Sequence, residues 1–101
     1  MSERKDVGPV LQAADAELVE ALLMALQEDN SDRPLEIIDR GGYVRVSCPD
    51  ECRLRRVTLE EKLGREVSLA EIEPVMASFA GRMRGDEEEL VWYLIKEQAN
   101  D

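Results

Sequence analysis

The hydrophobic pattern of this chain changes its period along the sequence, and that change restricts the folds that the chain can adopt. Asp15 is suited to cap the N-terminus of a helix that runs to about Glu28, and the apolar side chains of this helix recur at the spacing of one helix face. Residues 43–48 instead alternate apolar and polar side chains, which is the period of a half-buried strand. A chain that carries both periods predicts an α+β domain, with helices packed on a mostly antiparallel sheet. The expected helix stripe comprises Leu18, Val19, Leu22, Leu23 and Leu26, and the expected inward strand residues are Val44, Val46 and Cys48.

Other β-prone runs lie between turn-forming residues and predict further strands. They cover residues 7–12, 35–39, 53–57, 75–84 and 89–96. The runs at 35–39, 43–48 and 53–57 are expected to form one meander, with Gly41 and Gly42 in its first turn. The last two runs are expected to form a long hairpin that turns near residues 85–88. The domain then consists of two hairpin-containing halves with one longer helix and two short helices.

Two short helices are predicted by capping signals in the second half of the chain. Thr58 and Glu61 form a Thr-x-x-Glu capping box, and Ser68 and Glu71 repeat the device. Pro74 is expected to end the second of these helices, because proline lacks the N–H group that a helix interior needs.

Two residues inside the predicted strands indicate irregular pairing. Pro9 cannot donate to a β-ladder, so the strand at 7–12 is expected to lie at a sheet edge or to begin irregularly. Gly81 lies within the run at 75–84 and indicates a bulge or a close approach of two backbones. The run at 90–95 is apolar on both faces and is therefore expected to be central or covered on both sides.

The length of 101 residues suits one compact domain, which can bury roughly two-thirds of the surface of its unfolded chain. We expect a disordered tail over residues 1–6, a folded domain over 7–97 and a short C-terminal tail over 98–101. The sequence shows neither the N-terminal apolar run of a signal peptide nor the stretch of about 20 apolar residues that spans a membrane. A cytoplasmic location is therefore expected.

The charge balance is strongly acidic, with 23 acidic residues against 13 basic ones and a net charge of −10. Such a surface repels phosphate backbones and anionic lipid headgroups, so neither nucleic acid nor a membrane surface is an expected partner. An acidic surface favours solubility, and it can also steer the chain toward a basic patch on a partner protein. Both roles are compatible with the charge.

Side chains that commonly catalyse reactions or bind metals are scarce in this sequence. The chain contains no histidine, which is the commonest general base and the commonest metal ligand. Cys48 and Cys52 lack the further ligands of a zinc site, and they are expected to be a buried residue at a strand end and a loop cysteine. No pair of carboxylates is marked as an acid and a base. The sequence therefore predicts a binding protein, without metal, cofactor or catalytic residues, rather than an enzyme.

Several runs of residues, in order and at matching separations, resemble one known family. The most distinctive run is Thr58-Leu59-Glu60-Glu61-Lys62-Leu63-Gly64-Arg65, a T-[LVI]-E-E-x-L-G-R pattern. The chain resembles the effector, or regulatory, proteins of bacterial multicomponent di-iron monooxygenases. Within that family it looks most similar to the toluene monooxygenase effector and is related to the phenol hydroxylase regulatory protein. The other matching runs are Val7-Gly8-Pro9-Val10, Glu28-Asp29-Asn30, Tyr43-Val44-Arg45-Val46, Ala77-Ser78-Phe79-Ala80-Gly81 and Trp92-Tyr93.

The resemblance implies a function that needs no chemistry in the chain itself. Proteins of this family bind the hydroxylase component over its di-iron site and reshape its active site, which couples NADH use to regioselective hydroxylation. Electrons reach the hydroxylase from a reductase, with or without a Rieske ferredoxin that contends for an overlapping surface. By this resemblance the chain is expected to be a cofactor-free effector of an aromatic hydrocarbon monooxygenase, and we expect a monomer when it is free.

The resemblance also indicates which residues contact the hydroxylase. Glycines in such a surface would allow close backbone approach, and a phenylalanine could anchor it. A purely structural interpretation instead places Phe79 in the core, Gly81 in a bulge and Pro9 at a protected strand edge. The expected contacts are Gly8, Pro9, Asn30, Ser78, Phe79, Ala80 and Gly81.

Two other hypotheses are compatible with the residues. The chain could be an acidic adaptor unrelated to oxygenases, in which case it would form a stable complex without any effect on turnover. It could also be a small enzyme that uses only carboxylates, although the lack of histidine argues against that role.

Overall fold

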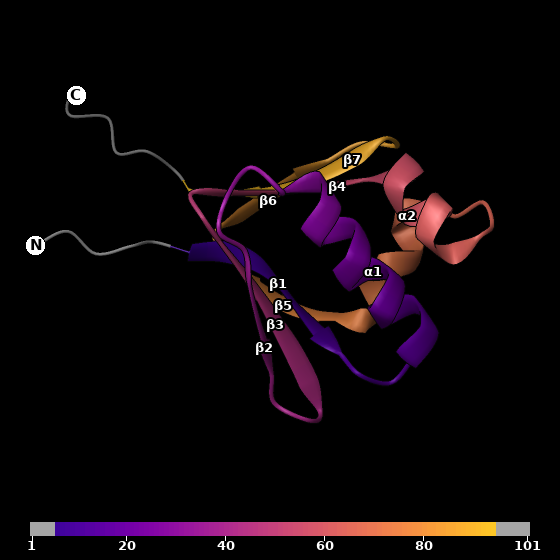
Figure 1. The fold of residues 1–101 in the computed structure, drawn as a ribbon, viewed down its shortest axis with the longest axis horizontal. Coiled ribbons are helices and arrows are strands. Elements are labelled where there is room, and N and C mark those ends of the chain that lie inside the picture. The colour runs from indigo at the N-terminus through magenta and orange to yellow at the C-terminus, as the bar shows by residue number, and fades with distance from the viewer. Residues whose placement is uncertain (1–5, 95–101) are drawn as a thin grey trace, which may run out of the picture.

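A computed structural model describes residues 6–94, which form seven strands, two α-helices and one 3₁₀ helix. The predicted α+β class, with one longer and two short helices, is confirmed (Figure 1). Within residues 6–94, no helix is both long enough and apolar enough to cross a lipid bilayer. In chain order the elements are β1 (Asp6–Gln12), α1 (Ala16–Asp29), β2 (Glu36–Asp39), β3 (Tyr43–Pro49), β4 (Glu51–Arg55), α2 (Arg56–Leu63), η1 (Leu69–Val75), β5 (Met76–Ala80), β6 (Arg82–Gly85) and β7 (Glu89–Tyr93).

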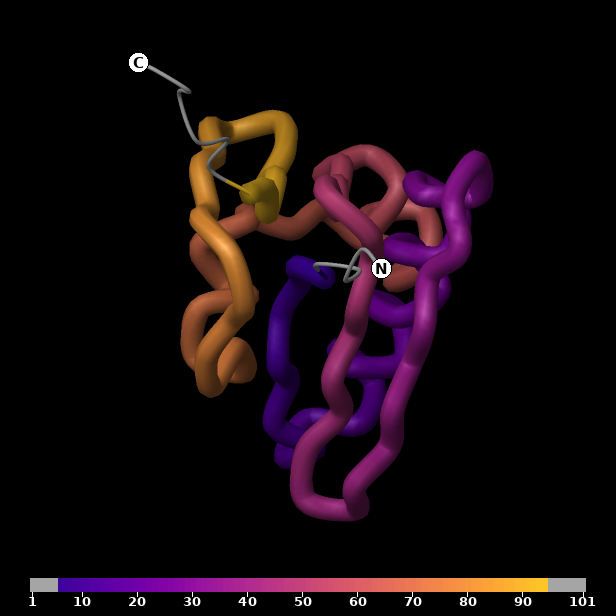
Figure 2. The backbone as a smooth tube through the Cα atoms, turned by 90° about the vertical axis from the view of Figure 1, so that its left-hand side faces the viewer, coloured from indigo at the N-terminus to yellow at the C-terminus, as the bar shows by residue number. Residues whose placement is uncertain are grey.

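The strands form two antiparallel sheets. The larger sheet has the order β2-β3-β1-β5, and the smaller sheet has the order β4-β7-β6. Figure 2 shows the β2–β3 hairpin as a long arm, with the segment from β5 to β7 on the other side of β1. Its turn has the predicted hairpin chemistry, because the Gly41 N–H donates to Asp39 Oδ1 at 2.8 Å and the Arg40 N–H donates to the Tyr43 carbonyl at 2.9 Å.

One continuous core joins α1 to both sheets. Leu22 and Leu26 of α1 are buried in the same cluster as Leu11 of β1, Leu54 of β4 and Trp92 of β7. The helix begins where predicted, since the Leu18 N–H donates to the N-cap side chain at 3.2 Å. The predicted apolar stripe is buried except for Leu23, which is only partly covered. The inward residues predicted for 43–48 are buried as well.

Strand β1 lies in the middle of the larger sheet, so the expectation of an edge position for Pro9 is wrong. The pairing of β1 with β3 runs from Asp6 opposite Pro49 to Gln12 opposite Tyr43, and it omits Gly8 and Pro9 in between. A proline that cannot donate a hydrogen bond is tolerated here because the ladder with β3 is interrupted at its position.

Strand β4 does not continue the predicted meander. It spans Glu51–Arg55 rather than 53–57, and it pairs with β7 in the smaller sheet. The chain leaves the larger sheet at Asp50, whose φ of 71° lies in the left-handed region that few residues other than glycine adopt. Local periodicity predicts such a strand but does not identify the strand with which it pairs.

Helix α2 begins at Arg56, so the predicted capping box at Thr58 and Glu61 is wrong. Thr58 lies inside the first turn, where its hydroxyl donates to Asp29 Oδ1 at 2.7 Å. The second box is confirmed, because Ser68 Oγ accepts from the Ala70 N–H at 3.2 Å and a Glu71 carboxylate oxygen accepts from the Ser68 N–H at 3.1 Å. This helix is 3₁₀ in form and ends one residue after Pro74, rather than at it.

Gly81 divides the strand predicted over 75–84 into β5 and β6, which belong to different sheets. Its φ is 90°, and a Cβ at this position would lie 2.6 Å from Val7 Cγ1 and 2.8 Å from the Tyr93 carbonyl oxygen. The close approach is therefore confirmed, but the single long strand is not. The other strand of the predicted hairpin, β7, is central as predicted and ends at Tyr93. Residues 95 and 96 of the predicted strand lie outside the described residues.

Candidate functional site

The face of the larger sheet opposite the core carries a shallow groove, which we call the open-face groove. Cross-strand pairs place its side chains on one face, since Val10 lies opposite both Arg45 and Ser78, and Gln12 lies opposite Tyr43. The groove has a volume of about 550 Å³. It is lined by Val10, Gln12, Arg40, Gly42, Tyr43, Arg45, Ala77 and Ser78.

The open-face groove differs in charge from the chain as a whole. Its charged residues are Arg40 and Arg45, and its lining includes no carboxylate, although the chain carries a net charge of −10. No ion pair between residues of the 6–94 segment involves either arginine. Arg53 and Arg56, by contrast, are paired with glutamates at 3.0 and 2.9 Å.

Strand β5 borders the open-face groove and is the outermost strand on its side of the sheet. Phe79 lies opposite Pro9 and is 41% exposed, so the structural interpretation that placed Phe79 in the core is not supported. Ser78 is exposed beside it, Ala80 is half-buried, and Gly81 is exposed at the turn into β6. These four predicted contacts therefore form one continuous segment at the sheet edge.

Gly8 and Pro9 are buried, so neither of these predicted contacts presents a surface in this structure. Gly8 lies against β3, where an added Cβ would come within 2.2 Å of the Val46 carbonyl oxygen. The pair is explained by packing inside the sheet. Glycine allows β1 to approach β3 closely, and proline follows where the ladder is interrupted.

Asn30 is also buried, with 2% of its surface exposed, and with Asp29 it forms what we call the α1 clasp. The Asn30 amide donates to the carbonyls of Leu26 and Arg53, both at 2.7 Å, and its oxygen accepts from the Arg53 N–H at 2.9 Å. Asp29 accepts from the Arg55 N–H at 2.7 Å. The clasp therefore joins the end of α1 to the edge of β4 that does not pair with β7.

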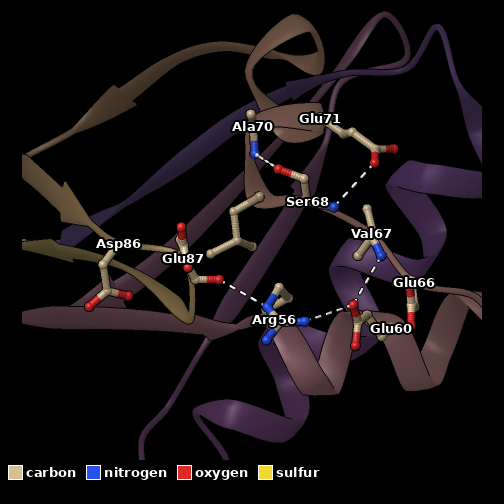
Figure 3. Close-up of a pocket in the computed structure, with 10 residues that line it drawn as sticks. Arg56, Glu60, Glu66, Val67, Ser68, Ala70, Glu71, Asp86 and Glu87 are labelled. Atoms are coloured by element: carbon tan, nitrogen blue, oxygen red, sulfur yellow. Dashed lines mark hydrogen bonds and ion pairs between the residues drawn. The ribbon is translucent and has the colours of Figure 1, made fainter.

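A larger hollow of about 870 Å³ lies between α2, the start of η1 and the β6–β7 turn (Figure 3). Arg56 lies in it and is fully engaged: it pairs with Glu60 and with Glu88, each at 2.9 Å, and donates to the Glu87 carbonyl at 2.9 Å. Glu60 in turn accepts from the Val67 N–H at 3.0 Å. These contacts connect α2 to the β6–β7 turn and to the segment that precedes η1.

The electrostatics of this hollow are those of a structural ion-pair network. The hydrogen bond from the Val67 N–H lowers the pKa of Glu60, and hydrogen bonding to Glu88 raises the pKa of Arg56. The remaining charged side chains of the lining are carboxylates: Glu66, Glu71, Asp86 and Glu87. A carboxylate held ionised and an arginine held protonated do not form an acid–base pair that exchanges protons near neutral pH. The hollow therefore offers no catalytic constellation.

The two cysteines are free and completely buried. Cys48 lies at the end of β3 as predicted. Cys52 is not a loop residue as predicted, because it belongs to β4 and lies opposite Trp92 of β7. The neighbouring Cys48 thiol, together with burial, raises the pKa of Cys52. Both are thus explained as small core residues. Among residues 6–94, no group of three or more potential ligands is arranged to hold a metal ion.

Comparison with known proteins identifies the family. The profile of the MmoB/DmpM family matches residues 5–93, and the chain therefore belongs to that family. The chain is 44% identical over 87 residues to the effector subunit of the alkene monooxygenase system of Xanthobacter autotrophicus, covering 86% of this chain and 84% of that protein. The predicted family is confirmed, and these similarities give no support to an unrelated adaptor. The finer placement nearest the toluene monooxygenase effector stays a prediction.

Solved structures share the fold. A chain in a structure of the phenol hydroxylase–regulatory protein complex superposes with a TM-score of 0.77 at 26% identity, covering 89% of this chain and 98% of that chain. The soluble methane monooxygenase regulatory protein B matches with a TM-score of 0.63 at 20% identity, covering 99% of this chain and 71% of that one. The second similarity supports the fold alone.

Sequence reasoning missed the open-face groove, although part of its signal is present in the sequence. The alternation over 43–48 places Tyr43 and Arg45 on the face of the strand that points away from the core. What the pattern lacks is the neighbour relation of β1, β3 and β5, which brings Val10 and Ser78 beside those side chains. That relation arises from pairing between segments far apart in the chain.

Proposed function

We propose that this chain is the effector subunit of a multicomponent hydrocarbon monooxygenase and acts by binding the hydroxylase component. The observation that carries this proposal is the 44% identity to an alkene monooxygenase effector subunit over most of both chains. The similarity to a chain from a phenol hydroxylase–regulatory protein complex supports the same kind of partner. A reductase supplies the electrons, with or without a Rieske ferredoxin, and the system operates in the cytoplasm.

The effector needs no reactive group for this role. A partner changes the rate of an enzyme when it binds one conformation of that enzyme more tightly than another. A difference of about 1–3 kcal/mol between the two conformations changes the equilibrium about 5–150-fold. A small domain with one continuous core, such as this one, presents a fixed surface for that purpose.

The contact surface that we propose consists of the members of the predicted set that reach the surface: Ser78, Phe79 and Ala80 of β5, and Gly81 directly after it. The buried members, Gly8, Pro9 and Asn30, act by holding the sheets in place behind that surface. Phe79 is the expected anchor, because a large apolar side chain exposed at a sheet edge gains most from burial against a partner.

The test is steady-state turnover by the matching hydroxylase and reductase, with the ferredoxin if the system has one, titrated with this chain. An alkene, toluene and phenol serve as substrates, because the relatives and the sequence point to different hydrocarbons. We expect more product per NADH, with saturation near one effector per active site. Absence of any change in rate and coupling for all three substrates, with a hydroxylase shown to be competent, would contradict the proposal.

Replacement of Phe79 by alanine is expected to raise the concentration of effector at half-maximal rate about 5–30-fold, as for an anchor residue of an interface. The thermal midpoint should change little, because the side chain is exposed. Met24→Ala is the matched control, since Met24 is similarly exposed, at 47%, but lies on α1. Equal effects of the two substitutions on the titration would show that β5 does not form the contact.

A further inference from the structure

We propose that the open-face groove binds an acidic segment of the hydroxylase, whose carboxylates pair with Arg40 and Arg45. This inference rests on the proposed function and identifies the partner chemistry of one part of the surface. Its basis is a local reversal of charge: a groove lined by two arginines and no carboxylate, on a chain with 23 acidic residues.

The backbone of each arginine is fixed by hydrogen bonding in the sheet or its turn. Neither side chain has a carboxylate partner within the described part of the chain. Arg45 is a residue of β3, paired with Val10 on one side and with Ile38 of β2 on the other. Arg40 is fixed at the hairpin turn by its N–H bond to the Tyr43 carbonyl. A guanidinium presents N–H donors in a planar fork that matches a carboxylate, so two such groups on one face favour an acidic ligand.

The rest of the lining leaves room for a chain segment. The lining also includes Gly42 at the hairpin turn and Ala77 and Ser78 of β5, whose side chains are small or absent, and Tyr43 is 47% exposed. Ser78 belongs to the groove and also to the proposed contact segment of β5, so the groove and that segment meet at this residue. Phe79, opposite Pro9, points to the other face of the sheet, because successive strand residues alternate between the two faces. A hydroxylase that wraps around the outer edge of β5 would contact both Phe79 and the groove.

The ligand that we favour is an acidic protein segment rather than a polyanion such as nucleic acid. A phosphate backbone would bring charges beyond the groove, where the net charge of −10 repels them. A short run of Asp or Glu on a hydroxylase matches the groove locally and keeps its other charges away. Such complementary charges favour one orientation of the two proteins.

The test is calorimetric measurement of binding between the effector and the hydroxylase, for single substitutions that remove or reverse one charge. Arg45→Gln is expected to weaken binding several-fold and Arg45→Glu at least about tenfold, because reversal adds repulsion to the lost attraction. Arg40→Glu should act in the same direction. The control is Arg65→Glu, which changes the net charge by the same amount at an exposed site outside the groove, where Arg65 lies 3.4 Å from Glu71.

Circular dichroism shows whether each variant is folded, and the exposed position of Arg45 predicts that it is. If Arg45→Glu and Arg40→Glu weaken binding no more than Arg65→Glu, the groove proposal is wrong while the effector function stands. If the unsubstituted chain itself neither binds nor activates a competent hydroxylase, the function and the groove proposal both fail. A larger loss of affinity for Arg45→Glu than for Arg45→Gln, with little or no loss for Arg65→Glu, supports the proposal.

Discussion

Replacing Gly8 by alanine is expected to lower the free energy of unfolding by about 3–5 kcal/mol, the sum of backbone strain and overpacking. Gly8 has a φ of 143°, which residues with a side chain rarely adopt, and its Cβ would lie 2.2 Å from the Val46 carbonyl oxygen. The obstructing atom belongs to the backbone of β3, so no side-chain rotation relieves the contact. Because a domain of this size is stabilised by only about 5–15 kcal/mol, the variant should be close to unfolding.

Urea unfolding followed by the fluorescence of buried Trp92 measures this effect. Gly42→Ala is the matched control, because a Cβ at Gly42 would meet nothing within 4 Å. We expect that control to change the unfolding free energy by less than about 0.5 kcal/mol. A loss below about 1 kcal/mol for Gly8→Ala would show that β1 can move away from β3 without penalty, contrary to the packing described above.

Asn30→Ala is expected to lower the free energy of unfolding by about 2–4 kcal/mol. The substitution removes the amide that bonds to the N–H and the carbonyl of Arg53, and each buried polar group left without a partner costs about 1–3 kcal/mol. Asn30→Asp should also destabilise, since its carboxylate cannot donate to the carbonyls of Leu26 and Arg53. Gln27→Ala, at an exposed position of the same helix, is the control and should be nearly neutral.

The Asn30→Ala variant also distinguishes the two roles considered for Asn30, a structural role in the α1 clasp and a contact with the hydroxylase. If Asn30 acts only within the α1 clasp, the folded fraction of Asn30→Ala should bind the hydroxylase with unchanged affinity. A loss of affinity without a loss of stability would instead place Asn30 in the interface. Urea unfolding and calorimetric titration on the same preparation distinguish the two outcomes.

Those parts of the fold that depend on local pattern could be predicted from the sequence. The α1 stripe and the inward residues of β3 follow from spacing, and the η1 capping box follows from Ser68 and Glu71. The sheets to which β4 and β5 belong could not be predicted from the local pattern. The assignment of these strands to sheets depends on the unusual φ of Asp50 and on the close packing at Gly81, which are properties of the folded chain. A periodic run of residues predicts a strand, but the strands with which it pairs depend on residues outside that run.

The candidate site was predictable to a similar extent. The family resemblance selected Gly8, Asn30 and Phe79 together, yet only Phe79 reaches the surface. A motif marks positions that a family retains for any reason, whether for packing or for contact. Arg40 was not selected, because its place in the groove arises only when the fold brings the hairpin turn and β5 to one face of the sheet.

The α1 clasp also has a consequence for the tendency of the smaller sheet to add strands from other molecules. A strand with unpaired N–H and C=O groups at its edge is a template to which another chain can add. In β4 the N–H groups of Arg53 and Arg55, and the Arg53 carbonyl, are instead occupied by the side chains of Asp29 and Asn30. Two side chains thus take the place of a neighbouring strand. Those backbone groups of the smaller sheet are therefore not available for hydrogen bonds to a strand of another molecule.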